Sequence, residues 1–217
     1  MDKKDLYNEL KLKIFREEIS PGTWLVEREL CEKYNLSRTP VREILRVLGA
    51  DGLITLEPTK GYSVRKLNFE EIVEIFQARE SVEGMAAKLS CLRGDPEFLH
   101  KIEKIKVELE QIDIVKDTYL GIETGKKLHN TIIEAARNDL LAEFYKKLSN
   151  LAALTRNLTK RSVEIEQNSR NDHIAIATAI LEKNGEKSEN SMRKHIKGTC
   201  LLLTRSYLME QTGLVST

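Results

Sequence analysis

The chain has 217 residues, 41% of them hydrophobic and 32% charged, and its 35 Lys and Arg nearly balance its 34 Asp and Glu. This length suits one or two domains with a real core, and the net charge of +1 excludes a chain coated with basic charge. No apolar run approaches the roughly 20 residues of a membrane span, and the first residues lack the apolar core of a signal peptide. Three widely spaced cysteines fit a reducing compartment, so we expect a cytoplasmic protein without a membrane partner.

The first 36 residues carry two helical patterns separated by a break. Residues 3–18 place apolar side chains at mostly helical spacing, and Pro21 with Gly22 ends that helix. We expect Trp24 to pack beneath the domain that these residues begin. Residues 26–34 are apolar at 26, 30 and 34, and Asn35 follows as a residue that tolerates the left-handed conformation of a helix C-cap. About four residues then separate this helix from the next, which is the length expected of a helix-turn-helix.

The next helix carries arginines four residues apart at Arg38, Arg42 and Arg46, which form one stripe along the helix. We expect Thr39 to be the N-cap and Pro40 to be the first helical residue. An arginine can neutralise phosphate and can bond guanine through two parallel N–H groups, so the stripe suits a helix in the DNA major groove. The alternative interpretation is a solvated charged face. A separate apolar stripe lies on another side of the helix, at Val41, Leu45 and Leu48.

Two short β-prone runs follow at residues 53–56 and 62–64, joined by a turn at residues 58–61. Three helices followed by a hairpin make a winged helix-turn-helix. The tip of the wing holds Lys60 and Gly61, so a cation and a bare backbone can approach a groove or a phosphate there.

A long run of residues carries a specific pattern within this segment: 21–25, 27–30, 36–43, 48, 51–54 and 61–64. In these residues the chain resembles the GntR superfamily of bacterial transcription regulators. The resemblance implies operator contacts from two helices and the wing, with Arg46 one turn further along as a phosphate contact or an exposed residue. The residues at the implied contact positions are Arg28, Ser37, Arg38, Thr39, Arg42 and Gly61, with Lys60 beside them at the wing tip.

A domain boundary is predicted between residues 1–67 and 68–217. Asn68 with Glu71 three residues later has the pattern of a capping box, and almost everything beyond it is helical by periodicity. The fold class we expect is therefore mostly α, with a winged helix-turn-helix followed by an antiparallel helical bundle. The predicted helical stretches of the bundle are 69–92, 96–113, 116–137, 139–160, 163–183 and 187–211.

Histidine supplies the second candidate site. His173 and His195 lie eleven residues either side of Asn184, where the chain is expected to turn, so they come level in an antiparallel hairpin. His129, near the middle of an earlier helix, would complete a cluster. Three neutral imidazoles can hold Zn²⁺ or another divalent transition metal with open positions left for a ligand. The alternative is three unrelated histidines, each satisfied on its own.

The bundle resembles the FCD ligand-binding domain of the FadR-like subgroup, through residues 78–83 and 128–138 and the later histidines. The resemblance implies a divalent metal, such as zinc or nickel, held by one Asp and three His. The Asp is expected four residues before His129, where this chain has Gly125, and Glu123 lies on another face. The cluster therefore holds metal without that ligand, or it binds an anion directly. Arg79 is a candidate anchor for a carboxylate, or else the ion-pair partner of Glu83.

These features predict a ligand-responsive transcription regulator rather than an enzyme. We expect a homodimer on a pseudo-palindromic operator, a small carboxylate effector, and repression as the output. One alternative is a metal-dependent enzyme that uses the three histidines, although no nucleophile–base pair stands out near them. Another is a sensor in which the metal itself is the effector.

Overall fold

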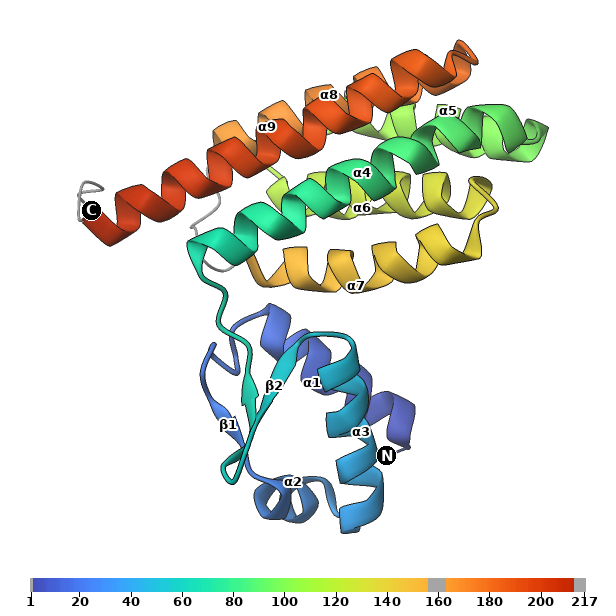
Figure 1. Cartoon of the computed structure of the whole chain (residues 1–217). Coiled ribbons are helices and arrows are strands. Elements are labelled where there is room, and N and C mark those ends of the chain that lie inside the picture. The colour runs from blue at the N-terminus through green and yellow to red at the C-terminus, as the bar shows by residue number, and fades with distance from the viewer. Residues whose placement is uncertain (1, 156–162, 213–217) are drawn as a thin grey trace.

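The computed structural model describes residues 2–155 and 163–212, and Figure 1 shows two parts, a small winged domain and a larger helical bundle. The winged domain runs from the first helix to the third strand. Its elements are α1 (Lys3–Phe15), β1 (Trp24–Leu25), α2 (Glu27–Tyr34), α3 (Arg38–Ala50), β2 (Ile54–Glu57) and β3 (Gly61–Val64). The predicted winged helix-turn-helix is confirmed.

The sheet of the winged domain is antiparallel with strand order β1-β3-β2. The predicted hairpin is present as β2 and β3, in which Ile54 pairs with Val64 and Glu57 with Gly61. Strand β1 was not predicted, because two residues carry no periodicity; it joins the sheet by pairing Trp24 with Ser63. Helix α1 ends at Phe15, the last apolar residue of its pattern, three residues before the predicted end at residue 18.

The turn between α2 and α3 has the predicted left-handed residue, since Asn35 has φ 50° and ψ 49°. The predicted start of α3 is wrong. Ser37 is the N-cap, with extended backbone, and the helix begins at Arg38. Proline is tolerated throughout the first helical turn because those N–H groups have no partner within the helix, so Pro40 does not mark its own position as the first. The apolar stripe is buried as expected: Val41, Ile44, Leu45 and Leu48.

The first helix of the bundle has Asn68 as its N-cap. Asn68 accepts a hydrogen bond from the N–H of Glu71, whose carboxylate accepts one from the N–H of Asn68, which completes the capping box. Of the predicted stretch 139–160, residues 156–160 lie outside the described residues. The bundle helices are α4 (Phe69–Arg93), α5 (Pro96–Gln111), α6 (Thr118–Ala135), α7 (Asp139–Thr155), α8 (Val163–Leu181) and α9 (Gly185–Thr212).

Helix α7 lies on the side of the bundle that faces the winged domain (Figure 1). The turn after α3 meets it directly: Gly52 has φ +78°, and a Cβ built on it would lie 2.9 Å from Cδ2 of Leu151. Beside this contact, Lys146 Nζ lies 3.5 Å from Asp51 Oδ1, and Asp51 accepts a hydrogen bond from the hydroxyl of Tyr7. The end of α3 therefore rests on α7.

Across residues 2–155 and 163–212, none of the helices is both long and apolar enough to cross a bilayer.

Candidate functional site

The first candidate site is the end of the winged domain farthest from the bundle, where α2 and the start of α3 lie (Figure 1). The predicted arginines of these helices are exposed. Arg28 and Arg42 have side chains that are 77% and 56% exposed, and Arg38 is also exposed. These guanidinium groups are accessible to a ligand, whereas the apolar stripe of α3 holds the helix on its core.

The N-terminus of α3 adds polar groups to this surface. Ser37 and Thr39 are exposed, and the Ser37 hydroxyl makes no capping hydrogen bond. The first N–H groups of a helix lack partners within the helix and attract anions, so the start of α3 suits a phosphate.

The wing tip carries Lys60 and Gly61, as predicted, with Gly61 at φ +98°. Lys60 Nζ lies 6.0 Å from the centre of the Trp24 ring. Trp24 is 39% exposed, so the expectation that it packs beneath the domain is wrong. Its two-residue strand lies at the sheet edge beside the wing, where the Lys60 ammonium group lies over the ring.

Arg46 lies two helical turns beyond Arg38 and occupies a different place. It is exposed, and with Arg65 and Lys147 it lines a hollow of about 420 Å³ at the junction of the winged domain and α7. This position is nearer the bundle than the other arginines of α3.

Arg42 has a partner that the sequence did not indicate. Its Nε donates a hydrogen bond of 2.8 Å to the carboxylate of Glu27, the first residue of α2. The two residues are 15 apart in sequence and come from different helices, so no local spacing marks them as a pair. Arg28, by contrast, lies 3.8 Å from Glu32 on its own helix.

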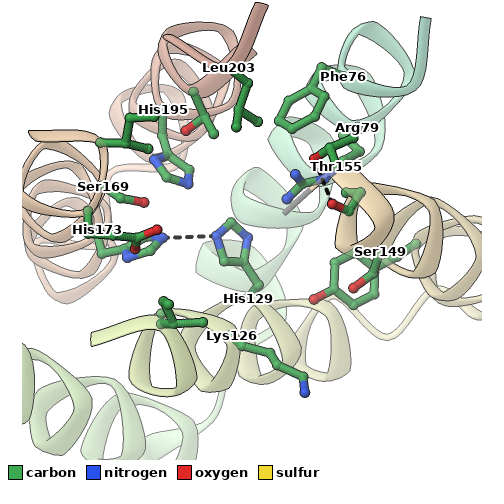
Figure 2. Close-up of a pocket in the computed structure, with 17 residues that line it drawn as sticks. Phe76, Arg79, Lys126, His129, Ser149, Thr155, Ser169, His173, His195 and Leu203 are labelled. Atoms are coloured by element: carbon green, nitrogen blue, oxygen red, sulfur yellow. Dashed lines mark hydrogen bonds between the residues drawn. The ribbon is translucent and has the colours of Figure 1, made fainter. Parts of the chain in front are cut away.

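The second candidate site is a cavity of about 90 Å³ inside the bundle, on which three imidazoles converge (Figure 2). The expected meeting of His129, His173 and His195 is observed, with one ring nitrogen from each lying within 4.8 Å of the others. All three residues are no more than 6% exposed. Nε2 of His129 lies 3.1 Å from Nε2 of His173. They come from α6, α8 and α9.

Carboxylates stand behind two of these rings. Glu83 Oε2 lies 2.5 Å from Nδ1 of His129, and Asp172 Oδ2 lies 3.6 Å from Nδ1 of His195. A carboxylate behind an imidazole favours a proton on the nearer nitrogen, which leaves the other nitrogen as a lone-pair donor toward the cavity. Neither carboxylate was predicted as part of the site, since only the fold brings them to the histidines.

Burial keeps two members of the cluster, His173 and His195, in the neutral form that binds metal. Burial, helped by the neighbouring histidines, lowers the pKa of His173 well below its usual range. Burial also lowers the pKa of His195, although Asp172 opposes the shift. Neutral imidazole is the ligand form, so these two rings need not lose a proton to bind a cation.

Arg79 and Glu83 form the ion pair that was the alternative interpretation of that arginine. The Nε of Arg79 donates a 2.7 Å hydrogen bond to Glu83, whose side chain is 1% exposed. Burial alone would raise the pKa of Glu83, but Arg79 and His129 lower it to about 2. Arg79 also lines the cavity, 5.0 Å from the Phe76 ring, and its terminal NH₂ groups remain candidates for an anion.

The absence of an Asp at position 125 has a structural counterpart. A Cβ built on Gly125 would lie 2.8 Å from Nδ1 of His173 and closer still to Cε1, so the ring fills the space above the glycine. Nδ1 of His173 is buried without a hydrogen-bond partner among the described residues. Three converging imidazoles fit a divalent transition metal, because zinc takes three histidines with an open fourth position. A metal bound at about 2.1 Å separates neighbouring nitrogens by about 3.0–3.4 Å, close to the observed His129–His173 separation.

The cavity as a whole suits a small anion. Figure 2 shows Arg79 across the cavity from the histidines, with hydroxyl-bearing side chains at its edge and Lys126 extending away from the imidazoles. The hydroxyl-bearing residues are Tyr145, Ser149, Thr155, Ser169 and Thr199.

A winged helix-turn-helix with exposed arginines, joined to a helical bundle with a small polar cavity, is the architecture of a DNA-binding transcription regulator. Comparison with known proteins supplies the family. Residues 2–64 match the model of "Bacterial regulatory proteins, gntR family", and residues 74–198 match the FCD domain. The chain belongs to the GntR family of bacterial regulators, in the group whose second domain is an FCD domain.

The chain is similar along most of its length to curated regulators. It is 27% identical over 196 residues to the uncharacterized HTH-type transcriptional regulator YdhC of Bacillus subtilis, covering 89% of this chain and 87% of the relative. It is 27% identical over 209 residues to the HTH-type transcriptional repressor GlaR of Escherichia coli, covering 88% and 91%. The solved structure of E. coli McbR/YncC has the same fold, with a TM-score of 0.77, 20% identity and coverage of 94% and 98%. The two curated relatives are named as transcriptional regulators, not enzymes.

Proposed function

We propose that the protein is a repressor that binds a pseudo-palindromic operator as a homodimer and responds to a small carboxylate. The observation that carries the proposal is the group of exposed arginines on α2 and at the start of α3, away from the bundle. A single winged domain with 13 Lys and Arg against 11 Asp and Glu in residues 1–67 is only weakly basic. Two copies on two half-sites would supply the affinity that one lacks. The relative GlaR is named a repressor, which supports the sign of regulation.

The DNA contacts divide by chemistry. Arg38 and Arg42 project from the start of α3, the part of a recognition helix that enters the major groove, and are assigned to base edges. Arg28, at the start of α2, is assigned to the same surface. Hydroxyl and cationic side chains that do not project into the major groove are assigned to phosphates, where they set the register of the protein on the duplex. The assigned phosphate contacts are Ser37, Thr39, Arg46, Lys60 and the backbone of Gly61.

The effector site is assigned to the bundle cavity. Arg79 would pair with a carboxylate of the effector through its terminal NH₂ groups, while Glu83 holds its Nε. His129, His173 and His195 would hold one divalent transition metal. Such a metal, when bound, supplies positive charge and open positions for an oxygen of the effector. The cavity volume of about 90 Å³ favours a small acid over a nucleotide-sized ligand.

Helix α7 is the route by which the cavity would influence DNA binding. Its residues Ser149 and Ala152 line the cavity, while Leu151 touches Gly52 at the end of the recognition helix. An effector that moves α7 would therefore move the winged domain. In a dimer, the spacing between the two winged domains, one from each copy, would change. The population able to fit the operator would shift accordingly.

The test is a binding titration with duplexes selected by the protein from a random pool, at moderate salt. Wild-type protein is expected to prefer the selected duplex strongly over a scrambled one, and Arg42→Ala to lose that preference while keeping its helix content. A preference that survives Arg42→Ala removes the recognition-helix assignment. Size measurement of the complex tests the dimer, and one protomer per duplex would contradict it.

A second candidate, a direct metal sensor, is favoured by the buried histidine cluster. Elemental analysis of protein purified without a histidine tag separates the possibilities. A resident metal is supported if the protein holds about one equivalent and removing that metal leaves operator affinity unchanged. A metal sensor is supported if adding free metal releases the operator. Less than about a tenth of an equivalent supports a site that binds an anion directly.

A further inference from the structure

An acidic side chain lies on the surface assigned to DNA. Glu27 is the first residue of α2, and its side chain is 33% exposed beside the start of α3. A carboxylate close to phosphates weakens binding, since the sequence-independent part of DNA affinity comes from neutralising phosphate charge. A negative charge at this position therefore opposes affinity for any duplex, whatever its sequence.

The contact of Glu27 explains how this charge can still favour recognition. Its Oε2 accepts a 2.8 Å hydrogen bond from Nε of Arg42, across the angle between α2 and α3. A guanidinium has five N–H donors in a planar fork, and the bond to Glu27 uses the one on Nε. The two terminal NH₂ groups remain, and a parallel pair of N–H groups is what bonds O6 and N7 of guanine.

Among the arginines assigned to DNA, Arg42 is the one whose guanidinium is held in this way within the described residues. Arg28 lies 3.8 Å from Glu32, beyond hydrogen-bond distance, and both of those side chains are more than 70% exposed. An unheld arginine loses rotamer freedom when it binds a base. Arg42 has part of that freedom removed before DNA arrives, so its orientation costs less on binding.

We infer that Glu27 is a positioning residue that presents the terminal NH₂ groups of Arg42 to a guanine of the operator. It raises the preference for the correct sequence and lowers affinity for DNA in general. This inference rests on the proposed function, because it requires a sequence-specific duplex. The pair lies wholly within the winged domain, so the inference is independent of the effector and of any metal.

The experiment uses the full chain, the duplex selected by wild-type protein from a random pool, and a scrambled duplex of equal composition. For Glu27→Ala, the ratio of affinities for the two duplexes is expected to fall about five- to tenfold, while affinity for the scrambled duplex stays equal or rises. Glu27→Gln keeps an acceptor for Nε and is expected to recover most of the ratio. Selection repeated with Glu27→Ala is expected to lose preference at one base pair of each half-site.

Glu32→Ala is the matched control, because it removes the same charge from the same helix without a hydrogen bond to a DNA-contacting arginine. Both affinities are expected to rise together, which leaves the ratio unchanged. In an Arg42→Ala background, Glu27→Ala is expected to have no further effect on the ratio. Circular dichroism of each variant checks that α2 and α3 are retained.

Three outcomes would overturn the inference. The ratio is unchanged in Glu27→Ala; or it falls equally in Glu32→Ala; or Glu27→Ala raises affinity for the selected duplex more than for the scrambled one, which means that Glu27 restrains Arg42 from binding. If wild-type protein selects no duplex at all, the proposed function itself fails and this inference fails with it. A wild type that selects a duplex isolates the role of Glu27.

Discussion

Gly125 of α6 lies against the imidazole of His173 on α8, so closely that a Cβ built on the glycine would stand 2.8 Å from Nδ1 of the ring. The ring therefore needs a residue without a side chain at position 125. A carboxylate there and the observed position of His173 exclude each other. In this chain, the imidazole of His173 occupies the space that an acidic side chain at position 125 would fill.

Gly125→Ala is expected to displace His173 and to weaken binding of Co²⁺, used as a spectroscopic probe of the cluster, by at least about tenfold. The added methyl group overlaps the ring, and buried rings have little room to move. Visible absorption of the bound cobalt measures the affinity. Gly198→Ala is the control, since Gly198 also lies in a helix but, among the described residues beyond its own stretch of helix, no atom lies within 4 Å of an added Cβ. It should gain up to about 1 kcal/mol of helix stability. Unchanged cobalt affinity in Gly125→Ala would show that the ring is not held there.

Patterns within one helix were readable from the sequence. The exposed stripe of Arg38 and Arg42, beside the buried Val41, follows from the helical period alone, because each helix buries its apolar side. The meeting of His173 and His195 also follows locally, since equal distances from a turn give equal heights in a helical hairpin. Only the turn had to be found correctly.

Contacts between distant segments were not readable. The Glu27–Arg42 hydrogen bond, the approach of Glu83 to His129, and the filling of the space above Gly125 each depend on how separate helices are placed. The sequence indicates Glu83 only as a neighbour of Arg79 at i, i+4. In the fold, one carboxylate oxygen of Glu83 accepts the hydrogen bond from Arg79 and the other lies beside His129.

Arg79→Ala is expected to destabilise the protein by about 3 kcal/mol, because removal of one partner leaves the buried carboxylate of Glu83 with much of its charge uncompensated. Arg79 and Glu83 have side chains that are 13% and 1% exposed, so solvent screens the pair little. Urea unfolding measures the loss. Adding Glu83→Gln to Arg79→Ala should restore part of the stability by removing the buried charge. Equal stability of the two variants would argue that His129 alone satisfies Glu83.

Acid should loosen the connection between the wing and the bundle. Glu71 of α4 accepts hydrogen bonds from the N–H of Asn68 and from Arg65, which follows β3. Burial opposes the shift, but these two donors lower the pKa of Glu71 below its usual value. A carboxyl whose pKa is lower in the folded state stabilises the fold above its unfolded pKa, about 4.3, and loses that contribution as the pH falls below it. Glu71→Gln should therefore reduce the fall in stability between pH 6 and pH 3 in urea titrations. An identical loss of stability in the wild type and in Glu71→Gln would show that Glu71 does not contribute to the acid sensitivity.

The contact between Gly52 and Leu151 gives the strongest test that the winged domain and the cavity are mechanically joined. Gly52 has φ +78°, and a Cβ would lie 2.9 Å from Leu151, which is 6% exposed. Gly52→Ala therefore adds both backbone strain and crowding against α7, at a cost of about 1–2 kcal/mol for the strained backbone alone.

Gly52→Ala should also increase amide hydrogen exchange in residues 145–152 of α7, although the substitution lies in the winged domain. Three residues of this range, Tyr145, Ser149 and Ala152, line the cavity. Leu151→Ala added to Gly52→Ala should relieve the crowding but not the backbone strain, so the two effects should be less than additive. Gly52→Ala, alone and with Leu151→Ala, should also change the cobalt affinity of the histidine cluster, because α7 contacts both the winged domain and the cavity. Exchange in α7 that is indifferent to residue 52 would mean that the two parts touch without transmitting force, and another element, such as the connection from β3 to α4, would then have to carry the signal.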